Sequence, residues 1–342
     1  EGAEIFSLPG PVTFVHTRTI VDPEWGSKLT GKAGRLALGV LAANDEAPGN
    51  VDDVTDPRHG QTAQNFLGRV NYNLYSESHL GAIFTDREFL ESSSMLGGVD
   101  GAFRLSRSMS TNFRLIGTRH RDLEGFEREG HVYDASIADN GRNLSWFAAA
   151  FEISPDFDTE VGFVRRVDQR RAVGNISYRW WPENWIINWG PRVSYARTYD
   201  FDDVLQDENS GLGVNVGFAK NIRLSSNFSR DMERFGGIDF FKTEYSIGGG
   251  VNTSRAFSIN ANYSQGDQIF FETILTDHPG IVAYEQQTDG ISLTFDNSVG
   301  SQCCGKAHQG DIRDGDSGFL PQDFFHRTRD AQGQVVTRGE RL

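Results

Sequence analysis

The sequence predicts an all-β fold of antiparallel strands that follow one another up and down, and three observations lead to this prediction. Apolar and polar residues alternate with a period of two in about sixteen segments. Many of these segments keep the alternation for nine residues or more. The connections between them are alternately short and long. Because successive side chains of a strand point to opposite faces, each segment has one apolar and one polar face.

The segment 63–74 illustrates the pattern. Apolar or small residues occupy its even positions from Phe66 to Leu74, whereas Arg69 and Asn71 lie between them, with Leu67 as the exception. The same alternation predicts strands at 11–20, 24–32, 34–44, 63–74, 79–86, 96–106, 111–120, 131–138, 143–153, 171–181, 185–198, 209–219, 221–230, 243–252, 255–265 and 289–296.

Segment length and connection length distinguish a membrane barrel from a soluble sandwich. Strands of soluble proteins cluster near five or six residues, whereas a tilted strand needs about 9–11 residues to cross a bilayer. Outer-membrane barrels place tight turns on one side and long loops on the other. The sequence therefore predicts an antiparallel up-and-down transmembrane β-barrel, with long connections near 44–62, 86–95, 120–131, 154–171, 199–208, 231–243 and 266–289.

Composition narrows the classes of function. The 342 residues include 47 acidic and 33 basic side chains, so we expect no nucleic-acid partner. No apolar run approaches the ~20 residues of a spanning helix. A mean hydropathy of −0.46 agrees with a barrel, because only every second residue of each strand would face lipid. The chain begins without an initiator Met or a signal peptide, which predicts a piece of a longer protein.

The period of two stops near residue 298. We therefore expect a barrel domain over residues 1–297, incomplete at about sixteen strands, and an irregular or disordered tail over 298–342. The tail contains the adjacent Cys303 and Cys304, which have no metal-ligand spacing around them. Four tryptophans flank the turn at 182–184, as in the aromatic girdle of a barrel; a soluble aromatic core is the alternative. They are Trp180, Trp181, Trp185 and Trp189.

Charged residues at strand positions are the candidate lumen-lining residues. A lipid-facing Arg near the membrane centre is unfavourable by about 2–4 kcal/mol, so parity places these arginines on the polar face, with Asp100 or Glu152 as partners. The candidates are Arg69, Asp100, Arg104, Arg114, Arg179, Arg192 and Arg223. They predict either an anion-attracting or sugar-binding pore, or a structural charge network, and we favour the network.

Other polar groups do not form a recognisable site. Acidic residues gather near 45–56 and 200–208 without the spacing of a calcium loop, so a solvated loop is the simpler interpretation. His120 and His131 flank an acidic stretch, but their spacing is too loose for a triad. The glycines at 211–217 and 248–250 lie inside strands, unlike nucleotide loops. We therefore assign no catalytic, cofactor-binding or metal-binding residue, and we expect no cofactor.

Three stretches resemble a known family. Residues 26–41 (GSKLTGKAGRLALGVL), 65–88 (NFLGRVNYNLYSESHLGAIFTDRE) and 151–171 (FEISPDFDTEVGFVRRVDQRR) are similar to an uncharacterised family of bacterial outer-membrane β-barrels. The resemblance covers roughly residues 10–296. In that family the barrel follows an N-terminal domain like family 9 carbohydrate-binding modules, and some members are labelled putative membrane-associated hydrolases. Here that domain and the last strands expected after Phe295 are missing, and the family offers no catalytic residues to carry over.

Three hypotheses about function follow. The first is an outer-membrane barrel that anchors a carbohydrate-binding domain and forms a pore for saccharides or small solutes. Its partners would be outer-membrane lipid, lipopolysaccharide and carbohydrate. The second is a membrane-associated hydrolase with a site at the barrel rim, for which the residues give little support. The third is a soluble all-β binding protein.

Overall fold

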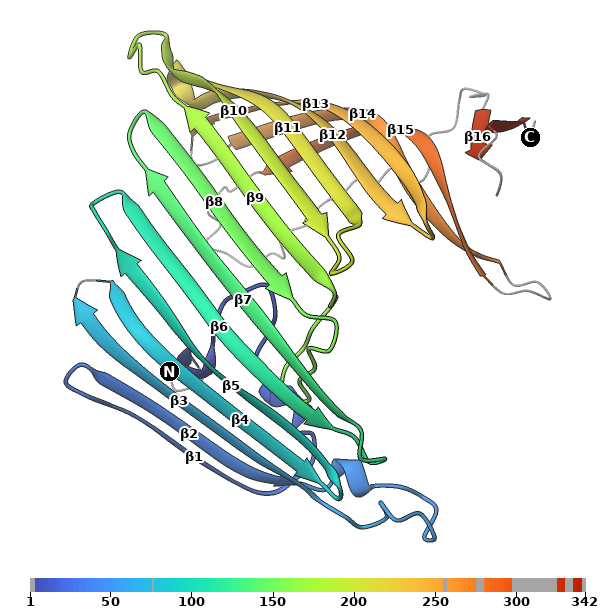
Figure 1. Cartoon of the computed structure of the whole chain (residues 1–342). Coiled ribbons are helices and arrows are strands. Elements are labelled where there is room, and N and C mark those ends of the chain that lie inside the picture. Colours follow the sequence, from blue (N-terminus) through green and yellow to red (C-terminus); the bar gives the residue numbers. More distant parts are fainter. Residues whose placement is uncertain are drawn as a thin grey trace, which may run out of the picture. The chain divides into compact units, whose positions relative to one another are not determined.

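The computed structural model describes residues 4–75, 77–254, 257–274, 280–296, 325–329 and 335–339. Fifteen strands form one sheet in which each strand pairs with its neighbours in the chain (Figure 1). They are Pro23–Ala33 (β1), Leu36–Asp45 (β2), Ala63–Tyr75 (β3), Ser78–Phe89 (β4), Ser92–Arg104 (β5), Met109–Arg121 (β6), Glu127–Asn140 (β7), Leu144–Ile153 (β8), Gln169–Tyr178 (β9), Ile186–Tyr199 (β10), Leu205–Phe218 (β11), Ile222–Phe235 (β12), Ile238–Ser254 (β13), Phe257–Ile274 (β14) and Gly280–Asp296 (β15).

The prediction of an all-β, up-and-down antiparallel fold is confirmed. The strand order runs from β1 to β15 without a crossover, and these two strands are its ends, so the sheet is open. The helical residues of the described chain form 3-10 turns, among them Thr17–Thr19 (η2), Ala47–Gly49 (η3) and Ala219–Asn221 (η4). No helix in the described part of the chain has the length and apolar character needed to span a membrane.

The expectation of a strand at 11–20 is wrong. Thr13 forms an isolated antiparallel bridge with Phe163, and residues 17–19 form η2. Val12 and Phe14 are apolar at alternate positions because both are buried in a core cluster on one face of the sheet. A chain segment that lies on a sheet therefore produces the same period-two pattern as a strand within it.

The predicted rhythm of short and long connections is also largely wrong. The connections expected near 86–95, 120–131, 199–208 and 231–243 shrink to 90–91, 122–126, 200–204 and 236–237, because the strands continue through charged sequence. Cross-strand ion pairs support these extensions, such as Arg234 with Asp239 (2.6 Å) and Lys242 with Glu233 (3.0 Å). The long connections at 46–62 and 154–168 remain. The connection expected at 266–289 becomes β14 and β15, and residues 275–279 between them lie outside the described residues.

Contacts divide the chain into two compact units. Unit 1 comprises Glu1–Gly141, Ser145–Gly174 and Thr198–Val204, and unit 2 comprises Arg142–Leu144, Asn175–Arg197 and Leu205–Leu342. Most of the expected irregular tail, including Cys303 and Cys304, lies outside the described residues. Within it, Phe325–Arg329 (β16) and Val335–Gly339 (β17) form a separate two-stranded antiparallel sheet.

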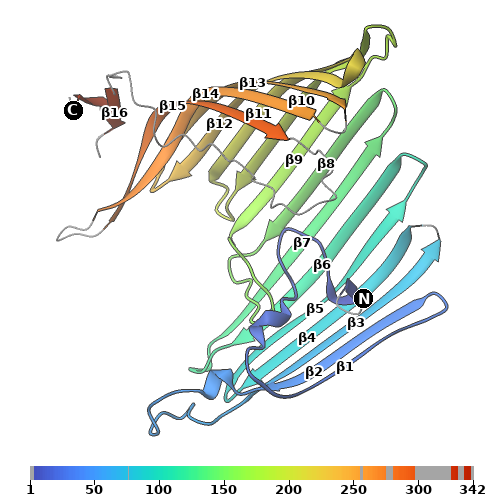
Figure 2. The ribbon, with the colours of Figure 1, turned by 180° about the vertical axis from the view of Figure 1, so that it is seen from behind.

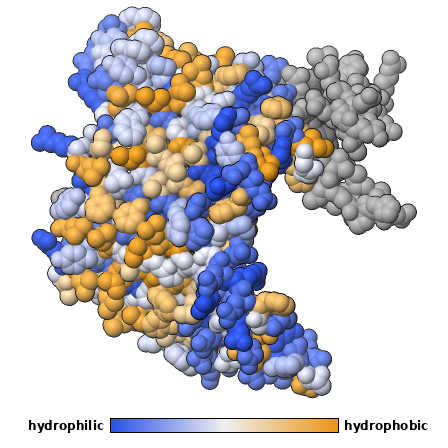
Figure 3. Space-filling model, in the orientation of Figure 1, coloured by the Kyte–Doolittle hydropathy of each residue, from blue (hydrophilic) through white to orange (hydrophobic). Residues whose placement is uncertain are grey.

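Both units have a polar face and an apolar face, and the parity of a described residue along its strand decides the face on which its side chain lies. In β3, Leu67 and Arg69 are buried on the polar face, whereas Phe66, Val70 and Tyr72 are exposed on the apolar face. Figure 3 shows hydrophobic residues spread over the visible side of unit 1, with hydrophilic residues at the end of its strands where residues 46–62 and 122–126 lie. We call this end of the sheet the loop end and the opposite end the turn end.

Two segments cover the polar face of unit 1. The N-terminal segment (residues 5–22) lies across the sheet, as Figure 2 shows, and the covering loop (residues 154–168) lies beside it. Phe14 of the first segment and Phe157 of the second are buried with Ile83, Leu96 and Ile116 of the sheet. Backbone hydrogen bonds between Thr13 and Phe163, at 3.1 and 2.7 Å, join the two segments. The polar face of unit 1 therefore carries a small apolar core of its own.

We predict that Gly130→Ala displaces the covering loop. A Cβ at Gly130 would overlap the backbone of Phe157, and overpacking of this kind destabilises by roughly 1–3 kcal/mol. Trypsin should then cleave faster at the exposed Arg165 and Arg166 in the loop, as measured by limited proteolysis of the full chain. Gly117→Ala on the neighbouring strand is the control, because the nearest atom to its Cβ would be 3.9 Å away. Equal cleavage rates in both variants would contradict the prediction.

Candidate functional site

Parity places all seven candidate lumen-lining residues on the polar face, but their environments differ between the units. In unit 1, Arg69 and Asp100 are buried, and Arg104 and Arg114 are half-buried. In unit 2, Arg179, Arg192 and Arg223 are exposed. The polar face is therefore closed by ion pairs and covering segments in unit 1, whereas in unit 2 its arginines are accessible.

Arg69 and Asp100 form the most deeply buried ion pair of the described residues. Their side chains are 3% and 4% exposed, and the guanidinium donates two parallel hydrogen bonds to the carboxylate, one of them 2.8 Å long. His79 lies 3.5 Å from the second carboxylate oxygen. Ala82 of β4 pairs with both Val70 of β3 and Val99 of β5, which brings Arg69 and Asp100 together across β4. Gly81 leaves room for the ion pair because it has no side chain; a Cβ at this position would lie 2.7 Å from Asp100 Oδ1.

Arg114 ties the N-terminal segment to the sheet. Its guanidinium donates two hydrogen bonds to Asp134 on β7, at 2.5 and 2.6 Å, and a third to the carbonyl oxygen of Pro9. Arg104 donates a hydrogen bond of 2.6 Å from its Nε to the carboxylate of Glu77. It donates a second one, of 3.0 Å, from its Nη1 to the carbonyl oxygen of Arg107. The charges of Arg104 and Arg114 are therefore engaged in holding turns and segments in place.

A second cluster of charges holds the covering loop, and sequence analysis missed it. Glu160 of the loop pairs with Arg87 of β4, and Asp158 lies 3.6 Å from Arg128 of β7. The buried imidazole of His120 lies between the two carboxylates, at 3.9 Å from Glu160 and 4.0 Å from Asp158. The parity rule that located Arg69 also places Arg87 and His120 on the polar face. The covering loop itself has no periodic signal that would have revealed its two acidic partners.

The three candidate arginines of unit 2, Arg179, Arg192 and Arg223, have no carboxylate partner among the residues that the structure describes. Arg179 lies over the ring of Trp181, with 5.4 Å between its Cζ and the ring centroid. Arg192 donates a long hydrogen bond of 3.4 Å to the Oδ1 of Asn227. Arg223 pairs in register with Gly217 and Gly250, which have no side chains to contact it. A guanidinium without a counter-charge is available to an anion from outside the chain.

The two central histidines do not form a joint site. His120 faces the polar face, whereas His131 faces the apolar face and lies 3.2 Å from Glu152. Of the two acidic partners expected for the polar-face arginines, Asp100 pairs with Arg69, whereas the expectation for Glu152 is wrong because it lies on the apolar face. Tyr133 stacks on His131 with 4.5 Å between ring centroids. The two imidazoles therefore cannot serve one substrate from the same side of the wall.

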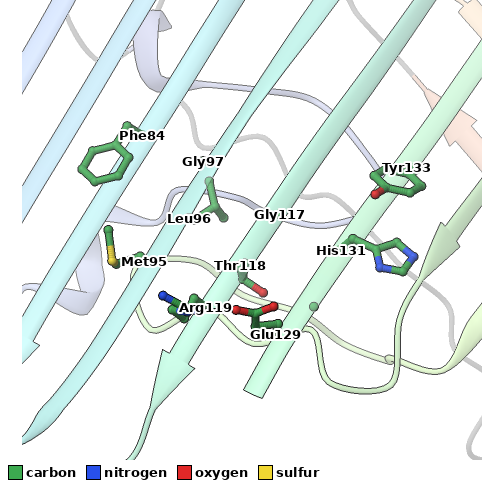
Figure 4. A pocket seen from close by; sticks show the side chains of 11 residues that line it. Phe84, Met95, Leu96, Gly97, Gly117, Thr118, Arg119, Glu129, His131 and Tyr133 are labelled. Atoms are coloured by element: carbon green, nitrogen blue, oxygen red, sulfur yellow. Dashed lines mark hydrogen bonds and ion pairs between the residues drawn. The ribbon is translucent and has the colours of Figure 1, made fainter. Parts of the chain in front are cut away.

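A shallow depression of about 620 Å³ lies on the apolar face of unit 1 (Figure 4). Gly97 and Gly117 are cross-strand partners and form its floor, while Phe84, Met95 and Tyr133 line its walls. The ion pair between Arg119 and Glu129 (2.8 Å) lies at its edge. Small residues in a wall of large ones account for the depression, and its lining contains no serine or cysteine.

No family model and no curated protein sequence matches this chain. Among the described residues, no group of three His, Cys, Asp or Glu side chains is placed to hold a metal ion. The candidate site is therefore defined by its geometry: the candidate residues of the polar face are ion-paired in unit 1 and exposed in unit 2.

The acidic stretches at 45–56 and 200–208 serve mainly as hydrogen-bond acceptors. Asp45 is buried and accepts the backbone N–H of Asp22 at 2.7 Å. Asp200 accepts the N–H groups of Asp202 and Val204 at 3.0 and 2.8 Å. Hydrogen bonds from the side chain and the backbone of Arg58 lower the pKa of Asp56 to about 2. These carboxylates therefore order their own loops.

We predict that removing the carboxylate of Asp100 destabilises the fold strongly. Asp100→Ala leaves the Arg69 guanidinium buried and unpaired, which is unfavourable by about 3–5 kcal/mol. The double variant Arg69→Leu/Asp100→Leu should regain most of this loss, because it buries no charge. Denaturant unfolding of the full chain in detergent, followed by tryptophan fluorescence, measures both effects.

An exposed ion pair provides the control for this experiment. Glu77→Gln breaks the ion pair with Arg104. Because the side chains of Glu77 and Arg104 are 68% and 38% exposed, this change should alter stability by less than about 1 kcal/mol. If Asp100→Ala were as mild as Glu77→Gln, the buried pair would not have the role assigned to it.

We predict a pH effect at the loop 46–62. Because the pKa of Asp56 falls from 3.8 to about 2, its ion pair with Arg58 is fully present above pH 3.8 and is lost as the pH falls through 2. The ¹³C chemical shift of the Asp56 carboxyl should therefore titrate near pH 2 in the wild type. In Arg58→Ala its midpoint should move back toward 3.8. An unchanged midpoint would show that Arg58 does not hold this carboxylate.

Proposed function

We propose that the chain is part of the wall of a bacterial outer-membrane β-barrel, with its apolar face toward lipid and its polar face toward a lumen. The observation that carries this proposal is the uncovered apolar face. On this face Leu29, Ile247 and Val193 are 65%, 57% and 47% exposed, while charged residues such as Arg69 and Asp100 are buried on the opposite face. A monomeric soluble protein rarely leaves a continuous apolar surface of this extent uncovered.

The height of the apolar face fits a bilayer. On β10 the face runs from Ile187 through Trp189 and Val193 to Tyr195, and Arg197 ends it at the loop end. Nine residues at about 3.4 Å each span roughly 30 Å along the strand, and a tilt of about 40° reduces this to roughly 23 Å. The apolar band of outer-membrane barrels is about 25 Å tall.

Aromatic side chains at the turn end support the same proposal. Trp180 stacks on Trp189 at 4.4 Å, and Trp185 stacks on Phe218 at 5.7 Å. Trp185 is 68% exposed on this surface. Amphipathic aromatic rings favour the boundary between lipid and water, where barrels carry girdles of such residues. At the loop end of unit 1, four cross-strand neighbours form a row on the apolar face, and three of them are charged. They are Asp86, Met95, Arg119 and Glu129.

The proposal extends to carbohydrate. The family that residues 26–41, 65–88 and 151–171 resemble combines such a wall with a carbohydrate-binding domain, so the wall would anchor that domain and provide a pore for saccharides or small solutes. The exposed arginines of unit 2 support the pore, because they lie on the polar face without counter-charges. Outer-membrane lipid and lipopolysaccharide would be the partners of the apolar face.

We predict that an added charge destabilises the protein on one face of β11 and has little effect on the other. Val214 lies on the apolar face and Asn215 lies next to it on the polar face. Val214→Arg should destabilise the protein folded in lipid vesicles by about 2–4 kcal/mol, because it places a guanidinium in hydrocarbon. Asn215→Arg should change stability by less than about 1 kcal/mol. Urea unfolding in vesicles and heat-modifiable migration in detergent gels measure the effect.

The same pair of variants tests the soluble alternative. If the protein stays monodisperse without detergent and Val214→Arg is as stable as Asn215→Arg, the apolar face does not contact lipid and the proposal fails.

A further inference from the structure

The polar face of unit 2 has a regular arrangement of amides and glycines. Asn227 pairs in register with Gly213, Asn262 with Gly248, and Asn260 with Gly250. In each pair the Asn Oδ1 lies close to the position that a glycine Cβ would take, at a distance of 2.6 Å for Gly213 and 3.0 Å for Gly248. Each amide therefore reaches over the glycine of the neighbouring strand. We call this surface the amide lattice.

The same device recurs on β10 and with hydroxyl groups. The Nδ2 of Asn188 lies 3.1 Å from the Cβ position of Gly217, and the Oγ of Ser194 lies 2.6 Å from that of Gly211. Ser225 shares the space over Gly248 with Asn262, at 3.1 Å. The lattice therefore presents uncharged donors and acceptors, and such groups match the hydroxyls of a sugar.

Two exposed arginines lie within the amide lattice. Arg192 reaches from β10 across Gly213 to Asn227 of β12, so the glycine makes room for its guanidinium. Arg223 lies four residues from Asn227 on β12, which corresponds to about 14 Å along the strand. Neither arginine has an ion pair within the described part of unit 2. In unit 1, by contrast, Arg69, Arg104 and Arg114 all have carboxylate partners.

The charge changes sign toward the loop end of the same face. Asp231 and Glu244 lie there, and Glu233 pairs with Lys242 at 3.0 Å. An anionic group is therefore favoured only in the part of the lattice between Arg223 and Arg192. This polarity fixes where the charged group of a ligand would bind.

We propose that the amide lattice binds an acidic saccharide, a polyhydroxylated chain that carries carboxylates. The guanidinium groups of Arg192 and Arg223 take the carboxylates in two-pronged hydrogen bonds, and the amides of Asn227 and Asn262 bind the hydroxyls. This inference rests on the proposed function, because the lattice is a lumen surface only if the apolar face contacts lipid. It adds the class of solute to that function.

The experiment measures binding to the full chain in detergent by isothermal titration calorimetry. The probes are an oligogalacturonate, a neutral oligosaccharide of equal length, and inorganic phosphate. We expect the oligogalacturonate to bind most tightly and Arg192→Gln/Arg223→Gln to weaken it at least about tenfold. Arg197→Gln/Arg230→Gln is the matched control, since it removes the same charge from the other face of β10 and β12 and should leave binding unchanged.

Each other outcome overturns the inference. Equal binding of the neutral and acidic sugars, with no effect of Arg192→Gln/Arg223→Gln, would remove the arginines from recognition. Phosphate binding as tight as the oligogalacturonate would reduce the lattice to a simple anion site, and no binding of any probe would leave it without a ligand. In all three cases a lipid-dependent penalty for Val214→Arg would leave the barrel proposal standing. If Val214→Arg did not destabilise the protein in lipid vesicles, the barrel proposal itself would be contradicted.

Discussion

The whole structure depends on the pairing of backbone N–H and C=O groups between neighbouring strands. A meander satisfies these groups in every strand except at its two edges. Because the backbone pairs within the plane of the sheet, all side chains must leave it on one face or the other. The composition of each face is then decided residue by residue, and the chain separates Phe66, Val70 and Tyr72 from Leu67 and Arg69 with one rule.

The residues on the polar face differ between the two units. In unit 1 it carries charges in opposite-sign partners, and two segments of chain cover it with Phe14 and Phe157. Removal of water strengthens each ion pair there but makes an unpaired charge unfavourable, which explains why Arg69 meets Asp100 with two hydrogen bonds. In unit 2 Arg192 and Arg223 are exposed, and amides such as that of Asn227 lie near them. The same sheet thus has a covered, ion-paired polar surface in unit 1 and an exposed polar surface in unit 2.

Sequence alone gave the strand faces reliably and the connections poorly. The parity of residues 66–74 and of the seven lumen-lining candidates holds in the structure because alternation is a local consequence of the extended backbone. Val12 and Phe14 were assigned to a strand because packing onto a sheet yields the same alternation. The strand extensions at Arg234 and Lys242 were taken for loops because cross-strand ion pairs, and not apolar residues, support them. The ion pair between Glu160 and Arg87 joins residues that are far apart in the sequence, and no local sequence pattern predicts such a contact.

The number of strands in the main sheet limits how the sheet can become a closed wall. Neighbours in an antiparallel meander alternate in direction, so the first and the fifteenth strands point the same way. An uninterrupted antiparallel ring needs an even count, as single-chain bacterial barrels have. β1 and β15 can therefore meet directly only as parallel partners. A fully antiparallel closure would need an odd number of additional strands between β1 and β15. The strand next to β1 and the strand next to β15 would each have to be antiparallel to its neighbour.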